Sequence, residues 1–282
     1  MRWLIGGALV TLGVAACSPL RFFDTVMPKD AGSRLVLSGA AYGADPRQKL
    51  DLYAPTMPAA RPWPVIVFMY GGSWNSGIRE GYGFVGRALA SRGFMVAIPD
   101  YRLVPTVRYP AFLEDNAAAV RWVIAHVGEY HGDPQRLVLA GHSAGAYNAA
   151  MLAYDPRWLG GARAAVRAMI GLAGPYDFLP SQLSSVIAAF GNAADPASTQ
   201  PINHIGPGAP PALLATGDKD DLVAPRNSDT LAARLQAAGS PVERRRYPRV
   251  GHLGLITAIA EPFRTRAPVL DDMANFARHY TQ

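Results

Sequence analysis

One stretch near the middle of the chain, residues 136–146, constrains the fold more than any other. The apolar run Leu137–Ala140 is typical of a buried strand, and the residues from Ala146 onward favour a helix. Between them lies Gly-His-Ser-Ala-Gly, with Ser143 at its centre. A strand that turns sharply into a helix strains the serine backbone, and glycines two residues away leave room for it. The stretch therefore predicts a nucleophilic Ser143 whose hydroxyl is lifted clear of the backbone, where a base and a substrate can both reach it. The alternative is an ordinary glycine-rich turn.

Strand and helix candidates alternate along the rest of the chain. The expected strands are Leu35–Ala41, Gln48–Tyr53, Val65–Tyr70, Phe94–Pro99, Val166–Ala173, Ala212–Thr216 and Val242–Tyr247. The expected helices are Phe84–Arg92, Phe112–Tyr130, Leu183–Phe190, Ser228–Ala238 and Val269–His279. This alternation predicts right-handed βαβ units, and so an α/β fold with a mostly parallel sheet. In such sheets ligands bind at the carboxyl ends of the strands, and the candidate residues described below all follow strands.

A base for the serine is expected later in the chain. A serine hydroxyl is a weak nucleophile at neutral pH and needs a base that an acid orients. In this fold type the order is serine, acid, histidine, and only His252 and His279 follow a plausible acid loop. We expect His252 to lie in a flexible loop after a strand and His279 on the surface of the terminal helix. His252 is therefore the predicted base.

The acid loop is Gly217–Asp221, directly after an expected strand. It holds Asp218, Asp220 and Asp221 within four residues. Aspartate is common in turns because its side chain bonds the local backbone, so some of the three are expected to be turn formers. Spacing alone leaves the choice of acid open.

Backbone donors for an oxyanion are expected at Gly71, Gly72 and Ser73, which follow a buried strand. Glycines let the backbone approach a ligand closely. Their N–H groups, together with that of Ala144 after the nucleophile, could stabilise a tetrahedral oxyanion. The alternative is a plain Gly-Gly turn.

These features together resemble the α/β-hydrolase superfamily, and more narrowly its esterase/lipase branch with an H-G-G-x-W oxyanion motif. That branch includes kynurenine formamidase-like and feruloyl esterase-like members. The similarity runs from about Tyr42 to the C-terminus and includes Lys49–Pro55 and Asp100–Leu103. The resemblance implies an eight-stranded, mostly parallel sheet flanked by helices, in one domain over residues 35–282 with a small cap around 174–208.

The resemblance also bears on the site. The family pattern G-x-x-D-x-x-V aligns with Gly217, Asp220 and Val223, which implies Asp220 as the acid, with Asp221 as second choice. The chain departs from the motif at Tyr70, where the branch has a histidine that holds the oxyanion loop. A tyrosine hydroxyl can also donate a hydrogen bond, but the loop could instead sit differently.

The implied activity is hydrolysis of carboxylic esters through an acyl-enzyme. The cap stretch carries many apolar residues, so we expect short to medium acyl or aryl esters as substrates; packing of the cap itself explains these residues equally well. An amidase or formamidase with the same triad, and a non-catalytic envelope binding protein on a hydrolase scaffold, are the alternatives. No metal-ligand cluster, phosphate loop or dinucleotide fingerprint occurs in the sequence, so we expect no cofactor and no metal.

The N-terminal segment has the sequence features of an export signal. Arg2 is followed by the uncharged stretch Trp3–Val14 and then by small residues. The segment Val14–Cys17 resembles a bacterial lipobox, which implies a signal peptide over residues 1–16, a lipidated Cys17 and a tether over residues 17–34. Since Ser18 is not aspartate, the resemblance implies an outer-membrane lipoprotein facing the periplasm. The alternatives are a soluble periplasmic or secreted protein and an uncleaved membrane anchor.

The net charge bears on possible nucleic-acid partners, and the cysteine count bears on possible disulfides. The formal net charge is +6, but the arginines are scattered apart from Arg244–Arg246, which lies in an expected strand. We interpret that run as a solvated strand face or edge and expect no nucleic-acid partner. The chain has one cysteine, so it can form no intramolecular disulfide.

Overall fold

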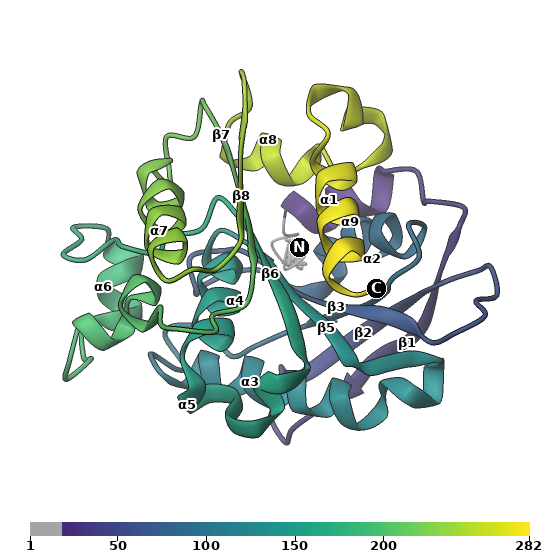
Figure 1. The fold of residues 1–282 in the computed structure, drawn as a ribbon, viewed down its shortest axis with the longest axis horizontal. Helices are drawn as coiled ribbons and strands as arrows, with labels where there is room; N and C mark the ends of the chain where they lie inside the picture. Colours follow the sequence, from purple (N-terminus) through teal and green to yellow (C-terminus); the bar gives the residue numbers. More distant parts are fainter. Residues whose placement is uncertain (1–18) are drawn as a thin grey trace, which may run out of the picture.

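The computed structural model describes residues 19–282, which form an eight-stranded sheet between two layers of helices (Figure 1). The strands are β1 (Ser33–Ala41), β2 (Lys49–Pro55), β3 (Trp63–Met69), β4 (Met95–Pro99), β5 (Gly132–His142), β6 (Val166–Leu172), β7 (Ala212–Gly217) and β8 (Val242–Tyr247). Their order in the sheet is β1-β2-β4-β3-β5-β6-β7-β8. Strand β2 runs antiparallel to β1 and β4, and all other neighbours are parallel. The predicted α/β fold with an eight-stranded, mostly parallel sheet is confirmed.

Helices cover both faces of this sheet. They are α1 (Pro19–Val26), α2 (Gly83–Ala90), α3 (Ala111–His126), α4 (Ala144–Tyr154), α5 (Pro156–Leu159), α6 (Ser184–Phe190), α7 (Arg226–Ala237), α8 (His252–Thr257) and α9 (Val269–Tyr280). Short 3-10 helices are η1 (Arg79–Tyr82), η2 (Val127–Tyr130), η3 (Gly160–Ala165), η4 (Ala197–Thr199), η5 (Pro201–His204) and η6 (Glu261–Arg266). Helices α3, α4 and α5 pack together on one face, and α2 and α9 meet on the other (Figure 1).

The central strands are buried because both of their faces are covered. Every residue from Val65 to Met69 and from Met95 to Pro99 is buried, as expected for apolar runs in a parallel sheet. Strand β5 begins at Gly132, five residues before the apolar run that predicted it. Its early residues are polar, but Gly132 already pairs with Trp63 of β3. Backbone pairing therefore extends the strand beyond its apolar part.

The N-terminal part of the described chain differs from the sequence prediction. We expected residues 21–34 to be irregular, but residues up to Val26 belong to α1 and β1 begins at Ser33. The Phe23 ring packs against the rings of Phe84 and Phe263, with centroids 5.1 and 5.8 Å away. Apolar residues at helical spacing along this segment explain why it forms a helix that packs against the rest of the domain. The predicted signal peptide and the lipidation site Cys17 lie outside the described residues.

The stretch predicted to form a cap, residues 174–208, contains α6, η4 and η5 joined by irregular segments. Helix α6 lies at the periphery of the molecule, away from the sheet (Figure 1). Within residues 19–282, no helix is both long enough and apolar enough to cross a membrane.

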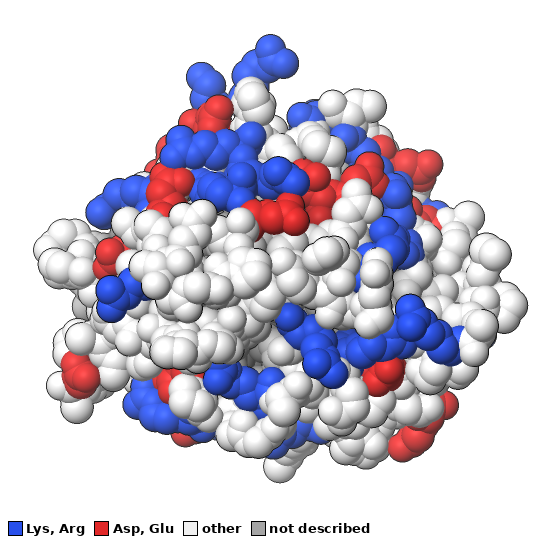
Figure 2. Space-filling model, in the orientation of Figure 1, with Lys and Arg blue, Asp and Glu red and all other residues white. Residues whose placement is uncertain are grey.

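The arginine run Arg244–Arg246 lies on β8, at one edge of the sheet, as the sequence predicted. Arg244 and Arg246 both form ion pairs with Asp229 of α7, at 2.9 and 2.5 Å. Figure 2 shows the Lys and Arg side chains in separate groups, many of them next to Asp or Glu, and a broad uncharged area between them. The positive charge is therefore distributed and partly compensated.

Candidate active site

Ser143 sits at the sharp turn between β5 and α4. Its backbone has φ 55° and ψ −124°, a conformation that residues with a side chain rarely adopt. A Cβ atom on Gly141 would collide with the backbone of Gly145, and one on Gly145 with the carbonyl oxygen of Met69. The two glycines are thus required by close backbone packing, which explains the Gly-x-Ser-x-Gly pattern physically.

His252 lies within hydrogen-bond distance of an aspartate 32 positions earlier in the chain. Its Nδ1 is 2.9 Å from Oδ2 of Asp220, and both residues are buried. The prediction that His252 lies in a flexible loop is wrong, because it is the first residue of α8. The helix forms because Leu255 and Ile256 fall on the same face as His252 and are buried with it. The imidazole is therefore fixed by a packed helix.

Asp220 is the acidic residue of the loop that the structure places against His252. Its other oxygen, Oδ1, accepts hydrogen bonds from the backbone N–H groups of Leu222 and Val223 at 3.1 and 2.8 Å. Burial opposes the charged form, but the bonds from His252 and from the backbone outweigh it and hold the pKa of Asp220 below its usual value. Asp221, by contrast, is exposed. Asp220 is thus a fixed carboxylate that can orient the imidazole.

His142, the residue before Ser143 in the turn, connects Ser143 to His252. Its ring lies against the ring of His252, with centroids 4.7 Å apart, and its Nε2 is 3.2 Å from the backbone oxygen of His252. Because a carbonyl oxygen can only accept, Nε2 carries the proton. Burial, together with the neighbouring His252, lowers the pKa of His142 to about 3. The residue is therefore neutral, and it ties the nucleophile turn to α8.

The predicted nucleophile and the predicted base share no direct hydrogen bond in this structure. Among residues 19–282, no hydrogen bond joins the Ser143 hydroxyl to the imidazole of His252. Such bonds are often long in proteins without substrate and tighten when substrate binds. The turn at Ser143 and helix α8 are held next to each other by the packing of His142 against His252.

The predicted oxyanion loop presses against the same turn. A Cβ atom on Gly71 would lie 2.9 Å from the carbonyl oxygen of His142 and 3.0 Å from Cβ of Ser143. The next two residues have positive φ angles, 133° at Gly72 and 51° at Ser73. This backbone brings Ser73 to the wall of a cavity of about 370 Å³ that Ser143 and Ala144 also line. The structure thus brings the loop and the nucleophile together.

Tyr70, which replaces the histidine of the branch motif, supports this loop from behind. Its buried hydroxyl donates a 2.8 Å hydrogen bond to Oδ1 of Asp100. Arg47 Nη2 donates to the Tyr70 hydroxyl at 2.8 Å and to the backbone oxygen of Gly77 at 2.9 Å. Burial and the Asp100 charge raise the pKa of Tyr70 well above its ordinary value, so the phenol keeps its proton and acts as donor. The loop between Tyr70 and Gly77 is held at both ends.

Asn227, another residue that the sequence analysis did not identify, holds the far wall of the cavity. Its Oδ1 accepts hydrogen bonds from the backbone N–H groups of Tyr176 and Asp177, both at 3.0 Å. It stands in the first turn of α7, and nothing in the local sequence distinguishes it from a surface asparagine. The rest of the lining is mixed: Phe178, Val186 and Leu222 are apolar, whereas Ser181, Ser185 and Arg226 are polar or charged.

The comparison with protein families agrees with this geometry. The family model BD-FAE matches residues 50–235, which include Ser143 and Asp220 and end before His252. The chain belongs to the BD-FAE family. Its fold is that of the α/β-hydrolase esterases.

Curated relatives of this BD-FAE chain carry esterase names. Esterase LipC of Mycobacterium tuberculosis is 30% identical, over 75% of this chain and 58% of its own length. Carboxylesterase NlhH of the same species is 41% identical over 35% of this chain and 31% of its own length. The probable isoprenylcysteine alpha-carbonyl methylesterase ICME of Oryza sativa is 42% identical over 42% of this chain and 28% of its own. The chain therefore spans little more than half of LipC and smaller parts of the other two.

Solved structures show the same fold. Esterase B from Lactobacillus rhamnosis, inhibited by a tributyrin phosphonate, aligns with a TM-score of 0.79 and 21% identity, over 93% of this chain and 89% of its own. A truncated carbohydrate esterase from gut microbiota aligns with a TM-score of 0.76 and 20% identity, over 90% of this chain and 99% of its own.

Proposed function

We propose that this BD-FAE member is a serine hydrolase that cleaves carboxylic esters through an acyl-enzyme. The observation that carries the proposal is the buried hydrogen bond between His252 and Asp220, beside the strained turn of Ser143. A base fixed by an acid next to a serine on a strained turn is the arrangement that activates a serine hydroxyl. The esterase names of the relatives support the same reaction class.

In the first half of the reaction, Ser143 Oγ attacks the ester carbonyl carbon while Nε2 of His252 takes its proton. The carbonyl electrons move onto oxygen, and the backbone N–H groups of Gly72, Ser73 and Ala144 donate to that oxyanion. Gly71 fixes the loop against the turn. Asp220 stabilises the imidazolium through Nδ1–H. The oxyanion then collapses, the bond to the leaving oxygen breaks, and His252 returns the proton to the departing alcohol.

In the second half, water replaces the alcohol. His252 takes a proton from water, the hydroxide oxygen bonds to the acyl carbon, and a second oxyanion forms in the same site. Its collapse breaks the bond to Ser143 Oγ, which recovers the proton from His252. The products are a carboxylic acid, an alcohol and the unchanged protein.

We propose short to medium acyl or aryl esters as substrates. The cavity at Ser143 has a volume of about 370 Å³, near the lower end of the range for small-molecule sites. Its cap-side wall belongs to the stretch from Phe178 to Ala194, which contains no Lys, Arg, Asp or Glu. This wall favours uncharged substrate groups because it holds no opposite charge to repay the desolvation of an ion. The one charged residue among the described residues that line the cavity, Arg226, belongs to α7 on another side.

Replacing the nucleophile tests the function. Ser143→Ala is expected to reduce kcat for p-nitrophenyl acetate by roughly 10³-fold or more, because no oxygen can form the acyl-enzyme. Ser185→Ala is the matched control, since Ser185 lines the same cavity but has no part in the reaction. Full turnover by Ser143→Ala would refute the proposal. Rates on matched aryl esters and aryl formamides separate an esterase from an amidase with the same triad.

We also propose that the protein is a lipoprotein of the cell envelope. Support comes from the sequence of residues 1–17 alone, with its uncharged stretch and its single cysteine at the end of a lipobox-like segment.

A further inference from the structure

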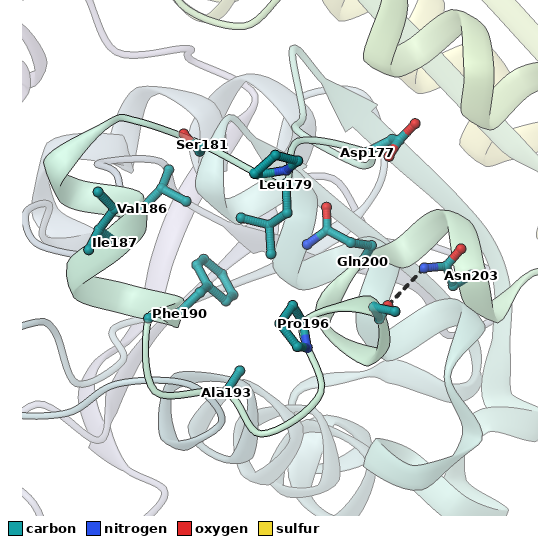
Figure 3. Close-up of a pocket in the computed structure, with 13 residues that line it drawn as sticks. Asp177, Leu179, Ser181, Val186, Ile187, Phe190, Ala193, Pro196, Gln200 and Asn203 are labelled. Carbon is teal, nitrogen blue, oxygen red and sulfur yellow. Dashed lines mark hydrogen bonds between the residues drawn. The ribbon is translucent and has the colours of Figure 1, made fainter.

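A second cavity, drawn in Figure 3, shares lining residues with the cavity that contains Ser143. Its volume is about 530 Å³, larger than that of the cavity at the nucleophile. It is bounded by α6, by the chain from Asp177 to Ser181, and by the segment that ends in Gln200 and Asn203. No step of the proposed reaction uses it.

The two cavities are neighbours that share part of their lining. Phe178 lines the cavity at Ser143, and Phe190 lines the second cavity; their ring centroids are 5.4 Å apart. Pro180, Ser181 and Val186 line both. A bound molecule that crosses this boundary would therefore touch both cavities at once.

The second cavity suits an uncharged, apolar group. In Figure 3 the side chains of Leu179, Phe190 and Pro196 point into it, whereas the carboxylate of Asp177 points away. The Gln200 amide also reaches it, but its oxygen accepts from the Phe178 N–H at 2.9 Å and its nitrogen donates to Thr199 at 2.8 Å. These bonds hold the amide in place. The lining thus offers mainly apolar contact, and the one charged residue that the structure describes in it, Asp177, turns its carboxylate away.

We propose that this second cavity binds the apolar or aryl part of the ester whose carbonyl lies at Ser143. The inference rests on the proposed function and narrows its substrate class to esters that carry a bulky uncharged group on one side. An acetyl group alone is too small to occupy both cavities. The volume of the second cavity falls in the range for small-molecule sites, so a phenyl ring or a medium alkyl chain fits it.

Two adjacent alanines allow a matched test. Ala193 lines the second cavity and not the one at Ser143, so Ala193→Phe would fill the second cavity and leave the nucleophile untouched. Ala194 is exposed and lines neither, so Ala194→Phe adds the same ring elsewhere. Each variant is assayed on two sets of esters. One set varies the acyl group of p-nitrophenyl esters from acetate to hexanoate and phenylacetate, and the other varies the alcohol of acetate esters from ethyl to hexyl and benzyl.

The wild-type protein is expected to prefer the bulky members of one set. Ala193→Phe should lower kcat/KM for those members by about 10-fold or more, the size of effect that a blocked apolar subsite gives. It should leave the p-nitrophenyl acetate and ethyl acetate rates within about two-fold, which also shows that the variant is folded. Ala194→Phe should leave the rates on both the small and the bulky esters unchanged. The set that responds tells which side of the ester the cavity holds.

Two results overturn the inference. One is a wild-type protein with no preference for bulky groups in either set, and the other is an Ala193→Phe variant that affects small and bulky esters alike. Failure of the proposed function gives a different result, namely no acetate hydrolysis that depends on Ser143 in the wild-type protein.

Discussion

The Tyr70 hydroxyl donates a hydrogen bond of 2.8 Å to the carboxylate of Asp100, and this bond joins the start of the oxyanion loop to the end of β4. Arg79 completes the arrangement, because its guanidinium pairs with Asp100 at 2.6 Å and with Asp51 at 2.9 Å. A tyrosine at this position therefore holds the loop through a buried polar network, where the resembling branch uses a histidine.

Removing that hydroxyl should impair the loop. In Tyr70→Phe, Asp100 loses a buried donor and Arg47 loses an acceptor, which should lower the free energy of unfolding by about 1–3 kcal/mol. We expect kcat for p-nitrophenyl acetate to fall by about 10-fold with little change in KM, because the loop acts on the transition state. Steady-state kinetics and urea unfolding measure both effects.

Tyr82→Phe is the control for this substitution. The Tyr82 ring is also buried and stacks on Tyr70, but its hydroxyl lies 3.5 Å from the nearest acceptor, the Gly71 oxygen. Loss of such a long bond should have a small effect on both quantities. If Tyr70→Phe behaved like Tyr82→Phe, the network would not position the loop.

The acid loop offers a second matched pair, Asp220→Asn and Asp221→Asn. The first replaces the carboxylate that orients His252, so kcat should fall by roughly 10²–10⁴-fold while the protein stays folded. The second alters an exposed side chain and should leave kcat within about two-fold. Equal losses in the two variants, or none in Asp220→Asn, would contradict the assignment of the acid.

His142 should make stability depend on pH. The folded protein keeps this ring neutral down to a pKa of about 3, whereas the unfolded chain binds the proton near the ordinary value of 6.5. As the pH falls between these values the unfolded state gains a proton that the folded state does not, so stability is lost. The slope attributable to His142 is up to about 1.4 kcal/mol per pH unit.

Urea unfolding of wild type and His142→Gln at several pH values between 4 and 7 measures this slope. The variant should show a shallower loss of stability with falling pH than the wild type. His279→Gln, at an exposed position on α9, is the control and should follow the wild type. Parallel curves for wild type and His142→Gln would show that the ring does not titrate between folded and unfolded states as described.

The lipid anchor is tested at Cys17. In a Gram-negative host, the full-length chain is expected to fractionate with membranes and to incorporate radiolabelled palmitate. Cys17→Ser should abolish the label and release the protein from the membrane fraction, since acyl chains provide the anchoring. Ser18→Ala should leave both unchanged. Membrane association that persists in Cys17→Ser would favour an uncleaved anchor instead.

Much of the fold was accessible from sequence because buried parallel strands leave a strong signal. The run Val65–Tyr70 predicted β3 to within two residues at each end, and the expected helix Leu183–Phe190 differs from α6 by one residue. Helix α8 was missed because it has only six residues and follows a glycine, which made His252 look like a loop residue. Helix α1 was missed because its few apolar residues were assigned to a tether.

The site was accessible only in part. The serine turn has a local sequence pattern that close backbone packing explains, so Ser143 could be found without a structure. The stacking of His142 on His252 joins residues 110 positions apart, and no local pattern encodes it. The same holds for the network at Tyr70, whose partners Arg47 and Asp100 come from separate turns of the sheet.

The central claim is that Ser143 is an activated nucleophile. Its most direct test is to treat the purified protein with a fluorophosphonate probe and to map the adduct by mass spectrometry. The account predicts a single covalent adduct on Ser143, absent from Ser143→Ala and much slower to form in Asp220→Asn. A folded wild-type protein that forms no adduct, or forms it on another residue, would contradict the account.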